Sequence, residues 1–388
     1  MQFIDALRAY AILMMLQGHF VHIMLDPDFC DLAHPIYAAW TFMRGMTAPI
    51  FFTITGLVFT YLLLRQGLPL GDNPRVKKGL RRGLQLIGIG YLLQLNWLNL
   101  VSLSPRAHWW EVDVLHCIGL GLITLIGLYA LHQKTGLSLP GLMLTVGLVL
   151  FVAEPLAKGT DWTWLPRALE HYFTKAHGST FTPIPWVGYT LIGGVIGWHI
   201  SRDTALYRTG WWPVFFLLTG WLLDSYSADG LLYLHEWSGL LVFKQMAYNN
   251  YLLIRLGHVC WVIAAFIWLE VLFRRFPPLL LKVGSETLFI YGAHYVLLYG
   301  SWLGVGITSL GKYSLSPWAC VAGAAGFVLL FLLLVHRLDA LRGGWRRARR
   351  LGRVWLLRSG PTWLCQACGQ LLIWRQLLLR RLPVGRTR

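Results

Sequence analysis

Residues 3–19 read Phe-Ile-Asp-Ala-Leu-Arg-Ala-Tyr-Ala-Ile-Leu-Met-Met-Leu-Gln-Gly-His, an apolar run that carries three ionisable side chains, Asp5, Arg8 and His19. With the apolar residues that follow, the run is long enough to cross a bilayer as a helix, which takes about 20 residues. The whole chain of 388 residues is 56% hydrophobic and only 13% charged. A soluble domain usually carries about 25% charged residues. The sequence therefore predicts an all-α membrane protein and excludes an ordinary soluble enzyme.

Further apolar runs of suitable length follow the first and predict a polytopic transmembrane helical bundle of about ten spans. The candidate spans are residues 5–25, 36–64, 83–101, 113–131, 138–155, 185–200, 211–224, 255–273, 283–303 and 318–336. The seventh is the shortest. We expect residues 1–336 to form one transmembrane domain and residues 337–388 to form a basic cytoplasmic tail.

The distribution of basic residues predicts the orientation. With the N-terminus inside, the inner segments hold 25 Lys and Arg residues and the outer segments hold 6. Cytoplasmic loops carry such an excess of Lys and Arg, so both termini are expected in the cytoplasm. The net charge of +17 is then explained by the membrane topology and by contact with anionic lipids, without nucleic-acid binding. The expected location is the bacterial inner membrane, as a multi-pass protein.

The expected tail has two features of its own. Residues 342–350 are dense in arginine, and residues 363–379 mix apolar and polar residues as an interfacial amphipathic helix does. Cys365 and Cys368 form a C-x-x-C pair without further ligands nearby, and the sequence leaves its role open. No metal site is expected, because the histidines are scattered over many spans without ligand spacing.

Arg8 and His19 lie on one face of the first span, since eleven residues correspond to three helical turns plus about 20°. The rise between them is about 16 Å, so one helix face presents polar groups at two depths of the membrane. Asp5 lies on the same face and can pair with Arg8. This pattern suits a polar path across the bilayer. The alternative is that Asp5 and Arg8 are a structural pair at a helix end.

More polar residues occur inside or beside the other spans, and most of them fall in the outer half. Ionisable groups in a membrane are costly and usually have a function or a partner. His34 lies at the membrane boundary before Pro35, and Pro49 is expected to break the second span. The remaining candidates in this group are Arg44, Asn96, Asp113, His116 and His294. Together they predict an outward-facing polar cavity.

Residues 3–19 resemble the opening span of the transmembrane acyltransferases typified by heparan-α-glucosaminide N-acetyltransferase and its bacterial homologues. The spacing of Arg8 and His19 is also similar to that in the acyltransferase-three family, which modifies surface polysaccharides. Weaker likenesses to later helices of the first family continue along the chain. They lie at residues 46–56 (Met-Thr-Ala-Pro-Ile-Phe-Phe-Thr-Ile-Thr-Gly), 113–119 (Asp-Val-Leu-His-Cys-Ile-Gly), 185–194 and 288–294.

The resemblance implies transfer of an acyl group, most simply acetyl, from cytoplasmic acetyl-CoA to a carbohydrate amine or hydroxyl on the outer side. It also implies a catalytic histidine, either His34 or His19. The residues themselves fit this chemistry: a neutral imidazole can act as base or acyl carrier, and Asp113 can orient it. Arg44 or Asn96 can stabilise an oxyanion. The substrate-binding candidates are Arg8, Arg44, Asn96, His116 and His294.

A basic run before the third span is the candidate site for the phosphates of CoA. It comprises Arg75, Lys77, Lys78, Arg81 and Arg82. The alternative is that these residues only follow the positive-inside rule. Two other classes of protein also remain open. A proton-coupled transporter uses buried ionisable residues as relays, and a non-catalytic scaffold needs neither His19 nor His34. A homodimer is compatible with the sequence.

Overall fold

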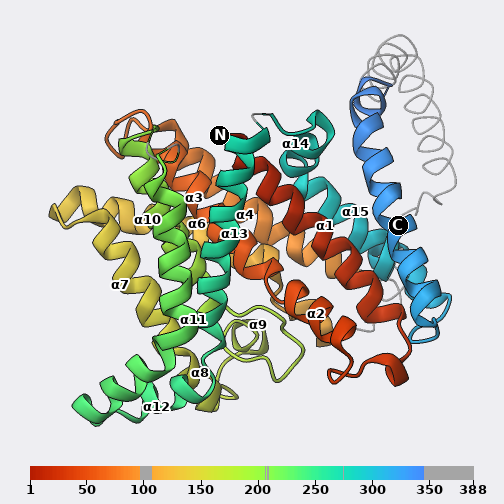
Figure 1. Ribbon diagram of the computed structural model, residues 1–388, viewed down its shortest axis with the longest axis horizontal. Helices are drawn as coiled ribbons and strands as arrows, with labels where there is room; N and C mark the ends of the chain where they lie inside the picture. Colours follow the sequence, from red (N-terminus) through yellow and green to blue (C-terminus); the bar gives the residue numbers. More distant parts are fainter. Residues whose placement is uncertain (97–106, 206, 208, 274, 345–388) are drawn as a thin grey trace, which may run out of the picture. The chain divides into compact units, whose positions relative to one another are not determined.

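The computed structural model describes residues 1–96, 107–205, 207, 209–273 and 275–344. This part of the chain is α-helical, with short 3-10 turns and one isolated bridge between Leu25 and Leu315 (Figure 1). The helices are α1 (Gln2–Met24), α2 (Pro35–Arg44), α3 (Thr47–Leu64), α4 (Pro74–Gln94), α6 (Val114–Thr135), α7 (Leu139–Val152), α8 (Glu154–Gly159), α9 (Arg167–Glu170), α10 (Pro183–Arg202), α11 (Trp211–Ser238), α12 (Leu241–Tyr248), α13 (Tyr251–Phe273), α14 (Pro278–Ser285), α15 (Thr287–Tyr299) and the helix Pro317–Gly344.

The all-α membrane class is confirmed. By length and composition, 5 helical segments of the described residues are able to cross a membrane: Pro35–Leu64, Val114–Thr135, Leu139–Gly159, Tyr251–Phe273 and Pro317–Gly344. Each overlaps one of the spans expected from the sequence. The other expected spans also contain helices, but these are shorter or less hydrophobic; α15, for instance, has 13 residues. For example, α1 carries Asp5 and Arg8, and α4 begins with a basic run.

Three details differ from the expectations. The second expected span is two helices, α2 and α3, and the break falls at Gly45 and Met46. Pro49 lies in the first turn of α3, where a helix tolerates a missing N–H, so it does not cause the break. The seventh span, expected to end at 224, continues as α11 to Ser238.

The chain divides into two units, Met1–Phe331 and Leu332–Arg388, and the site described below lies in the first. Most of the expected tail falls outside the described residues. This includes the arginine-rich run from residue 345 onwards, the expected amphipathic helix at 363–379, and the pair Cys365 and Cys368.

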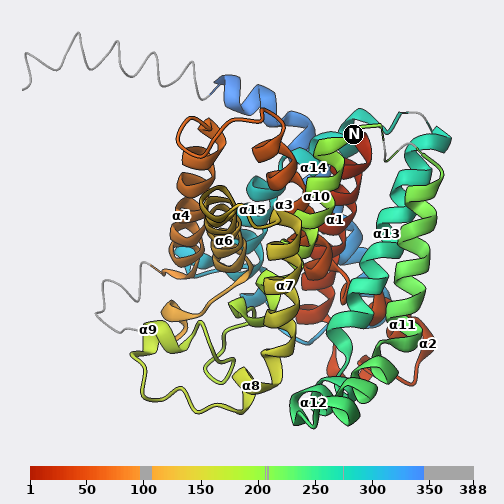
Figure 2. The ribbon, with the colours of Figure 1, turned by 90° about the vertical axis from the view of Figure 1, so that its left-hand side faces the viewer.

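The helices of the first unit run up and down between two ends (Figures 1 and 2). One end holds the first residues of α1 and α4 together with the short helix α14, and we call it the α14 end. The opposite end holds α2, α8 and α12, and we call it the α2 end. The helices α1, α4 and α15 therefore start at the α14 end and run towards the α2 end, which matters for the cavity between them.

Glycines allow the closest helix contacts. A Cβ atom on Gly56 of α3 would lie 1.7 Å from the carbonyl oxygen of Thr190 on α10. A Cβ atom on Gly193 of α10 would lie 1.9 Å from the carbonyl oxygen of Thr53 on α3. Backbones can approach this closely only where side chains are absent, as in membrane helix pairs with small residues at the interface. The pair α3–α10 thus forms a close helix contact, and α3 provides one wall of the cavity.

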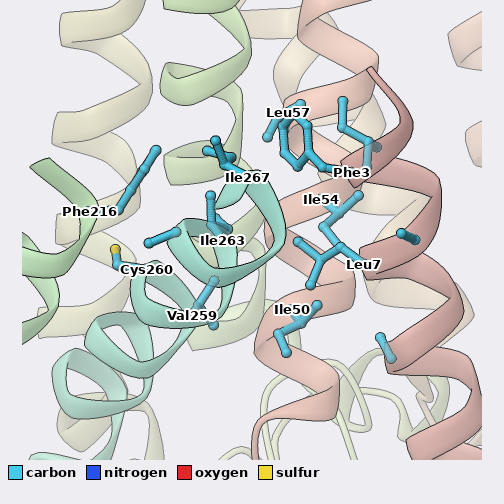
Figure 3. Packing of buried hydrophobic residues seen from close by; sticks show 14 of the residues in the cluster. Phe3, Leu7, Ile50, Ile54, Leu57, Phe216, Val259, Cys260, Ile263 and Ile267 are labelled. Carbon is cyan, nitrogen blue, oxygen red and sulfur yellow. The ribbon is translucent and has the colours of Figure 1, made fainter. Parts of the chain in front are cut away.

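An apolar core holds α1, α3 and α13 together (Figure 3). Phe3 and Leu7 of α1 face Ile54 of α3, and Ile263 of α13 closes the cluster from the other side. These side chains are at most 2% exposed, so the three helices cannot shift independently without opening cavities. The core therefore fixes α1, and with it the depth of Arg8 and His19.

Candidate active site

A cavity of about 1200 Å³ lies among α1, α3, α4, α6 and α15. On α1 it is lined from Arg8 to Ile23, a rise of about 22 Å at 1.5 Å per residue. On α4 it is lined from Arg82 to Gln94, and on α15 from Thr287 to Tyr299. Because these three helices run in the same direction, the cavity extends from the α14 end towards the α2 end. It is a passage along the helix axes and not a shallow surface pocket.

The α14 end of the cavity is cationic. The guanidinium of Arg8 lies 3.5 Å from the Asp5 carboxylate and donates to the Thr287 hydroxyl at 3.2 Å. The expected Asp5–Arg8 pair is therefore present. Arg82, from the basic run of α4, lines the same part of the cavity. Arg75, Lys77, Lys78 and Arg81 belong to the same two turns of α4 but do not line the cavity.

His19 lies further along the cavity wall, beyond Ile12 and Met15. Its Nδ1 atom is 2.9 Å from the hydroxyl of Tyr299 on α15. The ring of His294, which is fully buried, lies edge-on to the His19 ring with the centroids 5.2 Å apart. Since Nδ1 is engaged by Tyr299, Nε2 is the ring nitrogen left to act on a ligand in the cavity.

Asp113 is held at the start of α6. Its side chain accepts from the backbone N–H of Val114 and from the hydroxyl of Tyr291. The His116 Nδ1 atom accepts from the Asp113 backbone N–H at 3.1 Å, which completes a capping box. Asp113 lines the cavity, whereas His116 is buried behind it against Gly90. The Asp113 carboxylate thus accepts a hydrogen bond from the Tyr291 hydroxyl. The residue that forms a hydrogen bond with the His19 ring is Tyr299.

Two arginines reach the cavity beside the break between α2 and α3. Arg44, the last residue of α2, lies 3.4 Å from Nδ1 of His22 and 5.5 Å from the centre of the Trp40 ring. Arg255 of α13 donates to the carbonyl oxygen of Phe42 at 3.0 Å. Both line the cavity.

Glu111 lies in the loop before α6, outside the spans, and lines the α2 end of the cavity. Burial, reinforced by the nearby charge of Asp113, raises the pKa of Glu111 to about 7. A carboxyl group with such a pKa is about half protonated at neutral pH. It therefore carries about half a negative charge at neutral pH.

The structure brings some of the expected residues together and leaves others apart. Arg8, His19, Arg44 and Asp113 line one cavity, and His294 lies directly behind His19. The ring of His34 does not line it. His34 is exposed at the N-terminus of α2, before Pro35. Asn96 follows α4 and also lies outside the lining. No group of His, Cys, Asp or Glu side chains among the described residues has the arrangement of a metal site.

Sequence reasoning passed over Tyr299, although a signal for it exists. Tyr291, Tyr295 and Tyr299 follow one another at intervals of four residues, so they share one face of a helix, and all three line the cavity. A stripe of aromatic residues along one face of a helix is usually interpreted as part of the hydrophobic core. Only the position of α15 beside α1 reveals that Tyr299 meets His19, which is 280 residues away in the chain.

Comparison with family models gives a match over the first part of the chain. Residues 1–226 match the model described as heparan-alpha-glucosaminide N-acetyltransferase, catalytic. The matched region includes Arg8, His19, Arg44 and Asp113, whereas Arg255 and Tyr299 lie beyond it. Comparison with curated proteins and with solved structures gives no match. The family match covers more than half of the chain and includes most of the cavity wall, so this chain belongs to the heparan-α-glucosaminide N-acetyltransferase catalytic-domain family.

Proposed function

We propose that the protein transfers an acetyl group across the membrane, from acetyl-CoA on the cytoplasmic side to the amine of a sugar on the outer side. The observation that carries this proposal is the single cavity in which Arg8 and Arg82 lie at one end and His19 lies further in. Membership of the family supports the reaction class. The cavity supports transfer across the membrane, because it extends along the helix axes between the two ends of the bundle.

The proposed topology has ten crossings with both termini in the cytoplasm. The α14 end then faces the cytoplasm, and the α2 end faces outward. The positive-inside rule supports this orientation, because the first turns of α4 hold the five basic residues Arg75, Lys77, Lys78, Arg81 and Arg82.

Acetyl-CoA is proposed to bind at the α14 end. Its phosphates require cations, and Arg82 lines the cavity there while four other basic residues occupy the same two turns of α4. Arg8 is held by Asp5 and Thr287, so it can contact the donor without moving. Beyond it the wall is apolar, with Ile12, Met15 and Leu86, and suits the uncharged arm that carries the thioester.

His19 is proposed as the general base. In the productive tautomer, Nδ1–H donates to the Tyr299 oxygen and Nε2 carries the lone pair. The amine nitrogen of the acceptor bonds to the thioester carbonyl carbon and the carbon–sulfur bond breaks. Nε2 takes the proton from the nitrogen and passes it to the departing thiolate, which leaves as CoA-SH. Such proton transfer by a positioned histidine accelerates a reaction by about 10²–10⁴-fold.

Purified protein in detergent micelles, supplied with radiolabelled acetyl-CoA and a panel of amino sugars, tests the proposal. We expect labelled N-acetyl sugar from the wild type and from His34→Ala, and loss of nearly all turnover in His19→Ala with retained acetyl-CoA binding. Loss in His34→Ala with full activity in His19→Ala would overturn the assignment of the base. Absence of both turnover and acetyl-CoA binding in the wild type would overturn the function and favour a transporter.

A further inference from the structure

Two segments that are far apart in the sequence are joined where α1 ends and the helix Pro317–Gly344 begins (Figure 1). Leu25 forms an isolated parallel bridge with Leu315. The backbone N–H of Asp26 donates to the Leu315 carbonyl oxygen at 3.1 Å, and the N–H of Leu315 donates to the Met24 carbonyl oxygen at 2.9 Å. We call these joined segments the clasp, which comprises residues 23–30 and 313–320.

Each segment of the clasp carries one cysteine, five residues after its bridged leucine. These are Cys30 and Cys320, and both are free thiols in the structure. A tight turn shortens each interval. The N–H of Cys30 donates to the Pro27 carbonyl oxygen at 2.9 Å, and the N–H of Cys320 donates to the Ser316 carbonyl oxygen at 2.8 Å. Because the bridge is parallel and the intervals are equal, the two cysteines lie on the same side of it.

The two thiols lie in different surroundings, which suits stepwise oxidation. Cys30 is exposed, and its sulfur lies 3.8 Å from the carbonyl oxygen of Asp26. Cys320 is 1% exposed, on a helix that packs closely on α1: a Cβ atom on Gly323 would lie 2.7 Å from Cζ of Phe20. The Cys30 thiol is close enough to Cys320 to act on it electrostatically. An oxidant therefore reaches Cys30 first, and Cys320 is shielded until Cys30 has reacted.

We propose that Cys30 and Cys320 form a reversible disulfide bond that locks the clasp. The inference goes beyond the proposed reaction and uses only the proposed orientation, in which the α2 end faces outward, where disulfides persist. A protein disulfide on the outer side is the oxidant. The Cys30 thiolate attacks one sulfur of that disulfide, and the Cys320 thiolate then displaces the mixed disulfide from Cys30. The two cysteines lose two electrons and two protons, and the oxidant leaves as two thiols.

The disulfide restrains one edge of the cavity. Tyr313 begins the second segment of the clasp and lines the cavity, as does the preceding Lys312. The N–H of Tyr313 donates to the Ile23 carbonyl oxygen at 2.9 Å, and its φ of 56° is unfavourable for a residue other than glycine. Such a conformation persists only where its surroundings hold it. A covalent bond within the clasp keeps this cavity edge in place when the backbone hydrogen bonds open.

Counting reactive thiols tests the inference without any assay of turnover. The chain has six cysteines, and Cys365→Ser/Cys368→Ser removes the other pair close enough in sequence to oxidise, which leaves four. After treatment with oxidised glutathione and denaturation, a maleimide should label two of these four. Proteolysis should release two peptides joined through Cys30 and Cys320, and dithiothreitol should separate them. Oxidation should also raise the Tm in detergent by about 5 °C.

In the same background, Cys30→Ser should abolish both the joined peptides and the Tm shift. Its exposed position makes retained folding the expected result. Cys117→Ser is the matched control and should keep both, because a serine hydroxyl preserves the hydrogen bond to the Phe181 carbonyl oxygen. Four labelled thiols after oxidation would overturn the inference. A stable glutathione adduct on Cys30 or a disulfide-linked dimer would do the same, since either shows that Cys30 does not reach Cys320. Each of these results leaves the proposed acetyl transfer unaffected.

Discussion

The hydroxyl of Tyr299 lies 2.9 Å from Nδ1 of His19, and it joins the last turn of α15 to the C-terminal part of α1. The same helix also places His294 against the His19 ring, with the centroids 5.2 Å apart. A histidine held by a hydrogen bond on one nitrogen and by a ring contact on its side has little rotational freedom. The proposed base is therefore oriented before any substrate enters.

Tyr299→Phe should lower kcat by about tenfold to hundredfold while leaving the KM for acetyl-CoA unchanged. Loss of the hydroxyl removes the acceptor that holds the proton on Nδ1, so a smaller fraction of His19 has the lone pair on Nε2. Steady-state kinetics of the purified protein measures the effect. Tyr248→Phe is the control, because Tyr248 is 79% exposed at the end of α12. An unchanged kcat would show that Tyr299 does not position His19.

Arg82→Gln should raise the KM for acetyl-CoA by about tenfold, because a charge-assisted hydrogen bond to a phosphate contributes about 1.5–3 kcal/mol. Lys78→Gln should have a much smaller effect. Lys78 belongs to the same basic run but does not line the cavity, so it attracts the donor only through solvent. Equal effects of the two substitutions would indicate general attraction of CoA to a basic surface instead of a contact with Arg82.

As far as Glu111 contributes to it, thermal stability should fall as the pH rises from about 4.5 to about 7 and should level off above that range. Burial raises the pKa of Glu111 to about 7 from its ordinary value of 4.5, so the folded protein binds this proton more tightly than the unfolded chain does. The resulting stabilisation is complete below the unfolded pKa and disappears as the pH passes the folded one. Glu111→Gln should flatten this part of the Tm–pH curve, whereas Glu236→Gln, at an exposed position of α11, should not.

Gly193→Ala should destabilise the bundle by about 1–3 kcal/mol or more, because the added methyl group overlaps the Thr53 carbonyl oxygen at the α3–α10 contact. Gly127→Ala on α6 is the matched substitution, since a Cβ atom there meets nothing within 4 Å. Alanine is the better helix former, so Gly127→Ala should leave the Tm unchanged or raise it slightly. Thermal unfolding in detergent compares the two, and similar Tm values would contradict the close contact.

Helical periodicity predicted the part of the site that lies on a single element. Arg8 and His19 were expected on one face of the first span, and they line one cavity. The α2–α3 break was not predictable, because the apolar composition continues through Gly45 and Met46. The position of His34 depends on that break. With α2 lying at the end of the bundle, His34 is exposed and apart from the cavity.

Residues brought together by tertiary packing could not be paired from the sequence. Asp113 was expected to orient an imidazole, and its hydroxyl partner Tyr291 is 178 residues away. The basic run of α4 was recognised as a unit, yet only Arg82 reaches the cavity, because helical geometry turns its neighbours to other faces. The sequence shows which residue types are available for the site. The packing of α1, α4, α6 and α15 determines which of these residues come into contact.

The apolar middle of the cavity has an electrical consequence. A water-filled passage along the helix axes would let protons flow down the membrane potential, which is worth about 2.3 kcal/mol per charge at 100 mV. Between Arg8 and His19 the wall on α1 consists of Ile12 and Met15, and Leu86 and Leu122 face the same stretch from α4 and α6. Hydrophobic constrictions in membrane proteins expel water and so block conduction. We expect these four side chains to keep water out in the same way, so that a membrane can host the passage without losing its energised state.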